Sequence, residues 1–218
     1  MRRPIYVIPG LSVALTLAGT NLKLTVLVYN YAAIPGGTLV STKREAARIY
    51  KRIGIETEWV DCPLTAREWA RFPDCPVRPR PTDVIVRIVS QTMAERLPHD
   101  DNSLGFAQLP EDGRVGIFAN VFPSAAEQIA KPNGIRPSAV LASVIAHEIG
   151  HLLLGAGSHS LNGIMSAHWR PDELHAIGRG NLVFAPGESD RIRSAVRARL
   201  AAVNGDRYGP GHSDRRSQ

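Results

Sequence analysis

The sequence predicts one α+β domain, built on a twisted mixed β-sheet of about five strands with a long buried helix and a closing C-terminal helix. Three observations carry this expectation. Strand, helix and strand patterns alternate in the first 90 residues, a hairpin pattern follows near residue 110, and the strongest helical pattern covers residues 136–154. A chain of 218 residues with 44% hydrophobic residues is long enough for one well-buried domain and short for two.

The first part of the chain predicts a parallel pair of strands joined by a helix. The segment LKLTVLVYNYA, residues 22–32, is rich in β-branched residues, and IPGG ends it. Residues 41–54 then show helical spacing with Ser41 or Thr42 as the cap. A strand, a helix and a strand in this order favour a helical crossover. Two further strands are expected, over residues 55–62 and 82–90.

The middle of the chain predicts a hairpin and then the central helix. In residues 104–122, PEDG separates two short apolar runs, which is typical of a hairpin. The run near Gly105 to Leu109 is expected at the edge of the sheet, where an extended peptide could pair with it. Residues 136–154 are apolar nearly all round and Pro137 suits a first turn, so this helix should be buried.

The end of the chain predicts a small C-terminal subdomain that closes with a helix. Its last helix is expected to begin at Ser189 or Asp190 and to end near Gly205. The polar and glycine-containing residues 205–218 are expected to form a disordered tail. The sequence therefore divides into a folded domain over residues 21–204 and this tail, preceded by a distinct N-terminal segment.

Residues 1–20 are expected to be a signal peptide or an N-terminal anchor. Two arginines precede an apolar stretch that ends in small residues near Ala18, which is typical of a secretory leader. That stretch is shorter than the about 20 residues that a spanning helix needs, so no stable membrane span is expected. In a secreted, periplasmic or extracellular protein, Cys62 and Cys75 would pair in a disulfide.

The charge of the chain does not indicate a nucleic-acid-binding protein. The formal net charge is +6, but the arginines are scattered over the termini and a proline-rich loop. Scattered charge is typical of a solvated surface rather than of a nucleic-acid-binding stripe. No nucleic-acid partner is expected, and the chain is expected to be a monomer.

The segment HEIGH, residues 147–151, carries the chemistry. Residues four apart on an α-helix lie about 40° apart around the axis and about 6 Å along it, so His147 and His151 can meet on one ion. Glu148 lies at the flank of this pair, where it would miss direct ligation but could reach a water at the ion. This arrangement indicates a Zn2+ site in which Glu148 is the general base.

Two histidines do not complete such a site, and the sequence leaves the third ligand open. His159 is the first candidate, because Gly155 and Gly157 can end the helix and turn the chain back. Glu173 in RPDELHAIG is the rival, since one class of zinc peptidases takes a glutamate from a downstream helix. Weaker candidates remain in the same region: His168 and His175.

The segment HEIGHLLLGAGSH followed by GIM resembles the metzincin metallopeptidases, whose signature is H-E-x-x-H-x-x-G-x-x-H followed by a methionine turn. His147, Glu148, His151 and His159 match its roles, and Met165 matches the methionine. His159 lies twelve residues after His147, where the signature has ten. The pairing of a His-Ser dipeptide with this methionine is similar to the matrixins.

The resemblance implies a zinc-dependent endopeptidase acting on a protein or peptide substrate. It also implies that the peptide lies extended between the edge strand near Gly105 to Leu109 and a wall formed by residues 163–168. Two other functions stay open: a non-catalytic zinc-stabilised domain that binds peptides or a surface, and a zinc peptidase of the glutamate-ligand class that uses Glu173.

Overall fold

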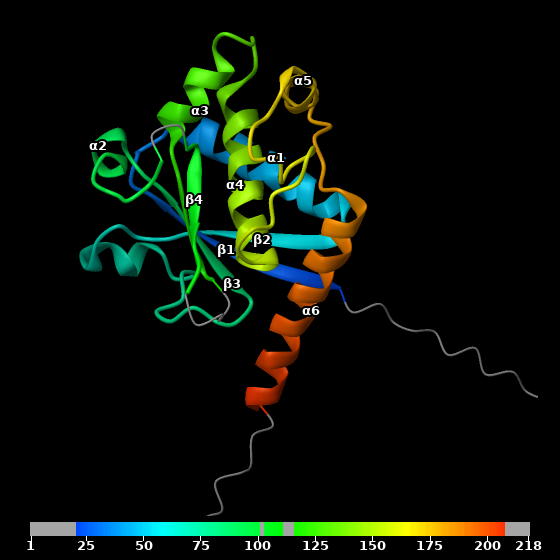
Figure 1. Ribbon diagram of the computed structural model, residues 1–218. Coiled ribbons are helices and arrows are strands. Elements are labelled where there is room, and N and C mark those ends of the chain that lie inside the picture. Colours follow the sequence, from blue (N-terminus) through cyan, green and yellow to red (C-terminus); the bar gives the residue numbers. More distant parts are fainter. Residues whose placement is uncertain (1–20, 101–102, 111–115, 208–218) are drawn as a thin grey trace, which may run out of the picture.

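The computed structural model describes residues 21–100, 103–110 and 116–207, and in these it forms one five-stranded sheet with helices packed against it (Figure 1). The order of the strands is β2-β1-β3-β5-β4. The strands are β1 (Leu22–Asn30), β2 (Ile55–Asp61), β3 (Asp83–Ile88), β4 (Gly105–Gln108) and β5 (Phe118–Val121). The helices are α1 (Gly36–Arg52), the 3-10 helix η1 (Ala66–Arg71), α2 (Gln91–Ala94), α3 (Pro123–Ala130), α4 (Pro137–Leu154), α5 (Pro171–Gly178) and α6 (Pro186–Arg207).

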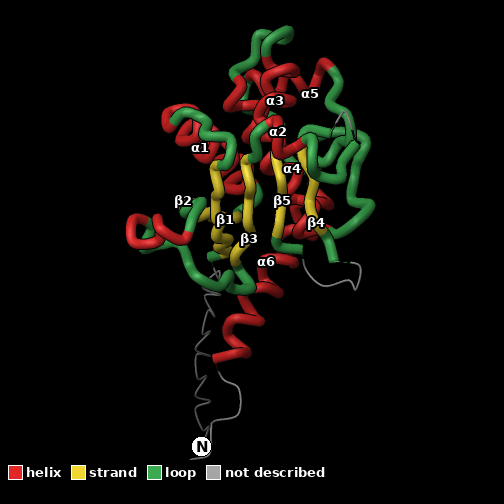
Figure 2. Tube along the Cα trace, turned by 90° about the vertical axis from the view of Figure 1, so that its left-hand side faces the viewer, coloured by secondary structure: helices red, strands yellow, loops and turns green. Residues whose placement is uncertain are grey.

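The sheet is mixed, as the sequence predicts. Strand β1 pairs in parallel with β2 and β3, β3 pairs in parallel with β5, and β4 is antiparallel to β5. Figure 2 shows β1, β3, β5 and β4 side by side. Helix α1 makes the crossover from β1 to β2, and β4 forms an edge of the sheet. Because helices alternate with mostly parallel strands, the architecture is a mixed α/β arrangement, and the expected α+β class holds only in part.

The main hydrophobic core lies between the sheet and helices α1, α4 and α6. It contains alternate residues of β1, whose side chains point to one face of the strand. Tyr50 of α1 is fully buried there, and its hydroxyl donates a hydrogen bond to the Ala146 carbonyl of α4 (2.9 Å). Further buried side chains come from the helices: Ile49, Ile145, Ile149, Ile192 and Val196. This core holds α4 against the sheet.

The opposite face of the sheet is covered by the loop that carries η1. The expected disulfide between Cys62 and Cys75 closes this loop. Both cysteines are buried and pack with Leu27 of β1 and Ile85 of β3 in a second cluster. The disulfide thus fastens the loop at the end of β2 to the face of the sheet away from α4.

Two helices begin earlier than the sequence predicts. Helix α1 starts at Gly36, so Ser41 and Thr42 lie inside it and do not cap it. Leu39 in this extra turn is buried in the main core, and that packing outweighs the low helix propensity of the two glycines. Helix α6 starts at Pro186 rather than at Ser189 or Asp190.

The predicted boundaries of the folded domain lie only partly within the described residues. Helix α6 runs to Arg207 and includes residues 205–207, which the sequence assigns to the tail. The leader over residues 1–20 and the rest of the tail lie outside the described residues, as does most of the PEDG turn. Among the described residues, α4 is long and apolar enough to cross a membrane by length and composition, but 78% of it is buried inside the fold.

Candidate metal centre

Helix α4 positions His147 and His151 on one side of its last turns. The helix is almost entirely buried, because nearly all of its residues are apolar and it packs against the sheet and against α1. One helical turn brings the Nε2 atoms of the two histidines to 3.0 Å from each other. The two rings are near-perpendicular, with centroids 4.7 Å apart.

The turn after α4 brings His159 to the same point. Gly155 ends the helix with φ of +88°, and Gly157 has φ of +66°, a region that disfavours other residues. The chain folds back, and Nε2 of His159 lies 3.1 Å from Nε2 of His151. Within the described part of the chain, His147, His151 and His159 form the group of side chains that could hold a metal ion, with all ligand atoms within 4.8 Å of one another.

The donor chemistry of this group fits a zinc ion. The Nδ1–H of His147 donates to the Ile164 carbonyl (2.7 Å), so its Nε2 carries a lone pair directed at the other rings. A single ring proton could form a hydrogen bond between only two of these nitrogens. One cation, in contrast, can bind the lone pairs of all three. Three nitrogens at about 2.0–2.1 Å from a tetrahedral zinc ion lie about 3.3 Å apart, close to the observed spacing.

Burial keeps two of the three rings neutral. Desolvation lowers the pKa of His147 to about 4. Desolvation, followed by the charges of His147 and His159, lowers the pKa of His151 to about 4. Both imidazoles are therefore neutral rather than imidazolium ions at neutral pH, as metal binding requires.

Glu148 lies on the sheet side of α4, between the helix and the edge strand β4. It is 5% exposed and is not part of the histidine group. Burial raises the pKa of Glu148 to about 8, and a hydrogen bond with the backbone of Ala107 opposes this rise. Gly105 makes room for the side chain, because a Cβ there would lie 3.0 Å from Cγ of Glu148 and 2.6 Å from the Asn120 carbonyl oxygen.

Met165 packs against the backbone of α4 at Gly150. It is fully buried, and its Sδ lies 2.4 Å from the position that a Cβ on Gly150 would occupy. The preceding residue, Ile164, supplies the carbonyl that binds His147. The Met165 carbonyl in turn accepts the Ser160 N–H (2.9 Å). Gly150, the fourth residue of HEIGH, therefore allows the turn around Met165 to support the centre.

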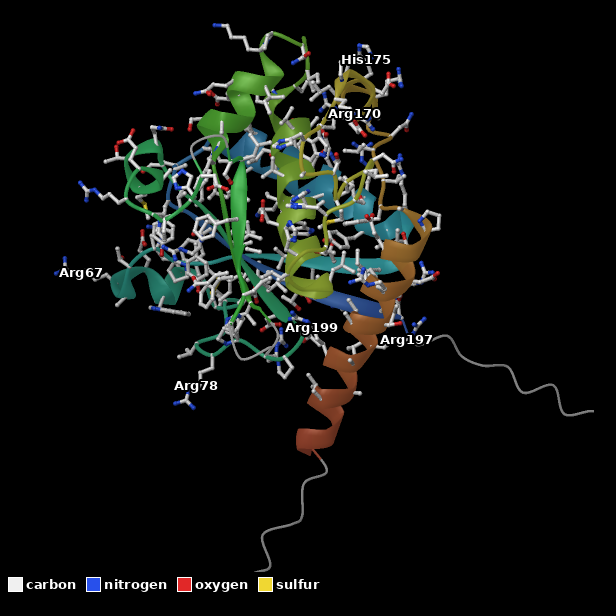
Figure 3. All side chains as sticks on the ribbon, in the orientation of Figure 1. Arg67, Arg78, Arg170, His175, Arg197 and Arg199 are labelled. Carbon is white, nitrogen blue, oxygen red and sulfur yellow. A yellow bond between two sulfur atoms is a disulfide. The ribbon has the colours of Figure 1, made fainter. Side chains whose placement is uncertain are left out.

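The structure does not bring Glu173 into the histidine group. Its carboxylate instead accepts the Arg170 N–H (2.9 Å), which caps the first turn of α5. The expected short helix over RPDELHAIG is present as α5, but it uses Glu173 for its own N-terminus. His168 is exposed, and His175 is exposed on α5, as Figure 3 shows; neither belongs to the group.

Four supporting features lie outside the sequence prediction. They are the glycines at 105 and 150, the Ile164 carbonyl, and Ser158, whose hydroxyl lies 2.9 Å from Nδ1 of His151. A glycine inside an otherwise apolar helix costs about 1 kcal/mol relative to alanine, so Gly150 is itself a signal of close packing. The carbonyl carries no such signal, because every residue has one.

Comparison with known proteins yields structural likeness only. No protein-family model matches the chain, and no curated protein matches it. The chain is similar to the crystal structure of archaemetzincin from Methanopyrus kandleri, with 14% identity and a TM-score of 0.48, over 83% of this chain and 99% of that chain. It is also similar to the solution structure of TM1509 from Thermotoga maritima, with 14% identity and a TM-score of 0.34, over 86% and 99%.

Proposed function

We propose that the protein is a zinc-dependent endopeptidase of the metzincin type, with a matrixin-like active-site segment. The observation that carries the proposal is the convergence of three histidine Nε2 atoms on α4 and the turn after it, where the next residue after His147 is a buried glutamate outside their group. His147, His151 and His159 would hold the ion. When bound, zinc acts as a Lewis acid, which acidifies water and polarises a carbonyl group.

Glu148 is the residue that moves the proton. Its carboxylate takes a proton from the attacking water as the water oxygen bonds to the peptide carbonyl carbon. The same proton then passes to the leaving nitrogen as the C–N bond breaks. Burial raises the pKa of Glu148 to about 8, so its side chain is mostly protonated at neutral pH in the metal-free protein. A cation held by the adjacent histidines would lower that pKa again.

The free edge of strand β4 favours an extended peptide as the substrate rather than a small molecule. Within the described sheet, β4 pairs only with β5, so its other edge is free of a strand partner. A peptide that pairs with this edge would run past Glu148, which packs against Gly105 of the same strand. The protein or peptide would thus be held extended with a scissile bond near the histidine group.

We also propose an extracellular or periplasmic location and a monomeric state. The location is supported by the disulfide between Cys62 and Cys75, since such bonds persist in oxidising compartments, and by the leader-like sequence of residues 1–20. The monomer rests on the sequence alone.

Removal of zinc tests the proposed function. The purified full chain should contain one zinc ion and should cleave casein or a mixed fluorogenic peptide library. Treatment with 1,10-phenanthroline should abolish cleavage, and added zinc should restore it, because the ion supplies the Lewis acid. Zinc content by elemental analysis and cleavage rate are measured on the same samples.

Two outcomes would contradict this proposal. Cleavage that survives complete loss of zinc would exclude a zinc peptidase. A zinc-loaded, folded protein that is inert toward diverse peptides would instead favour the non-catalytic alternative, a zinc-stabilised domain that binds peptides or a surface.

A further inference from the structure

The interval between His151 and His159, residues 152–158, contains a buried serine next to the metal centre. Ser158 is 7% exposed although it lies in the turn after α4. We infer that Ser158 is a positioning residue, which holds His151 in the tautomer that can bind the metal ion. The inference rests on the proposed function only in taking His151 as a ligand.

The hydrogen bonds of Ser158 fix the direction of its proton. The hydroxyl oxygen lies 2.8 Å from the Gly155 carbonyl oxygen and donates to it. A carbonyl oxygen cannot donate, and a serine hydroxyl has one proton. The same oxygen lies 2.9 Å from Nδ1 of His151. Because its proton is used by Gly155, the oxygen can only accept a hydrogen bond from this ring. Nδ1 of His151 therefore carries the ring proton and donates it to Ser158.

This tautomer leaves the Nε2 lone pair of His151 free for the ion. The other tautomer would set a lone pair on Nδ1 against the lone pairs of Ser158, unless the hydroxyl gave up its bond to Gly155. An outer partner that orients a metal-ligating histidine typically contributes 10-fold to 100-fold to metal affinity. For His147 the partner is a backbone carbonyl, and for His151 it is this side chain.

The local fold explains how the serine reaches this position. Gly155 and Gly157 have positive φ, so the chain turns tightly enough for Ser158 to lie under the last turn of α4. The serine bridges the helix end at Gly155 and the ring of His151, and the next residue is the third histidine. The longer interval before His159 thus contains a hydrogen-bonded link between the end of α4 and the metal centre.

Three single variants of the full chain test the inference: Ser158→Ala, Ser158→Thr and Ser160→Ala. Zinc affinity is measured by competition with a chromophoric chelator, and folding by circular dichroism. We expect Ser158→Ala to weaken zinc binding by about 10-fold to 100-fold, because Nδ1 of His151 loses the hydroxyl that lies 2.9 Å from it. Ser158→Thr keeps the hydroxyl and should restore most of the affinity. Ser160 is the matched control, because its hydroxyl donates to the Asn162 carbonyl (2.8 Å) and not to a histidine.

Nitrogen NMR of the metal-free protein provides a readout independent of zinc and of cleavage. The 15N shifts of His151 should show the proton on Nδ1 in the wild type and a mixture of tautomers in Ser158→Ala. A wild-type His151 protonated on Nε2 would overturn the inference, as would a folded Ser158→Ala that binds zinc as tightly as Ser160→Ala. If Ser158→Ala does not fold, the tautomer of His151 in the wild-type protein still tests the inference. A protein with the expected tautomer and zinc affinities but no peptidase activity would contradict the proposed function alone.

Discussion

Replacement of Glu148 by glutamine is expected to reduce peptide cleavage by about 100-fold to 10,000-fold while zinc stays bound. Glutamine has nearly the shape of glutamate and can occupy the same buried space between α4 and β4. Its amide cannot accept the proton of the attacking water. The measurements are kcat/KM on a fluorogenic peptide, zinc content and the unfolding temperature.

Glu173→Gln is the matched control for this variant. Glu173 is also a buried glutamate, but it caps α5 and lies outside the histidine group. Its glutamine variant should keep zinc and most of the activity, with at most a modest loss of stability. Cleavage that survives in Glu148→Gln would sink the assignment of the general base. Loss of zinc from Glu173→Gln would instead support the glutamate-ligand class.

Gly150→Ala is expected to destabilise the protein by about 1–3 kcal/mol and to weaken zinc binding at the same time. The added Cβ would lie 2.4 Å from Sδ of Met165 and 3.3 Å from the ring of Phe184. Met165 is fully buried, so any shift of its side chain has to be accommodated inside the core. Its displacement would shift the Ile164 carbonyl away from His147. Urea unfolding and chelator competition measure the two effects.

Two further variants isolate the contact between Gly150 and Met165. Gly187→Ala places an alanine in α6, where a Cβ would meet nothing within 4 Å, and should cost little or no stability. Adding Met165→Ala to Gly150→Ala removes the collision, so the double variant should lose less than the sum of the two single losses. A Gly150→Ala protein with wild-type stability and zinc affinity would show that the turn is not packed against α4 in this way.

The larger elements of the fold are predictable because their patterns are local. The alternating run of β1 and the long apolar stretch of α4 each determine their structure over many residues. The start of α1 is not predictable in this way, because the burial of Leu39 depends on the distant sheet and α4. Helix α2 spans only 4 residues, about one turn, so it shows no periodic pattern.

The candidate site likewise contains residues that local patterns predict and residues that only the folded chain brings together. His147, Glu148 and His151 follow from the geometry of one helix, and the return of His159 follows from two glycines in the next turn. The choice between His159 and Glu173 needs the structure, because it depends on how the segment after α4 folds. Gly105 is more distant still, 43 residues before Glu148 in the chain, and its contact with Glu148 arises only when β4 packs beside α4.

The central claim is that Nε2 atoms of His147, His151 and His159 hold one zinc ion. The most direct test is a crystal structure of the zinc-loaded chain, with the ion located by anomalous scattering at the zinc edge. The expected result is one ion at about 2.0–2.1 Å from all three Nε2 atoms, with Glu148 outside the ligand set. An ion held without His159, or one with the carboxylate of Glu173 in the third position, would contradict the claim.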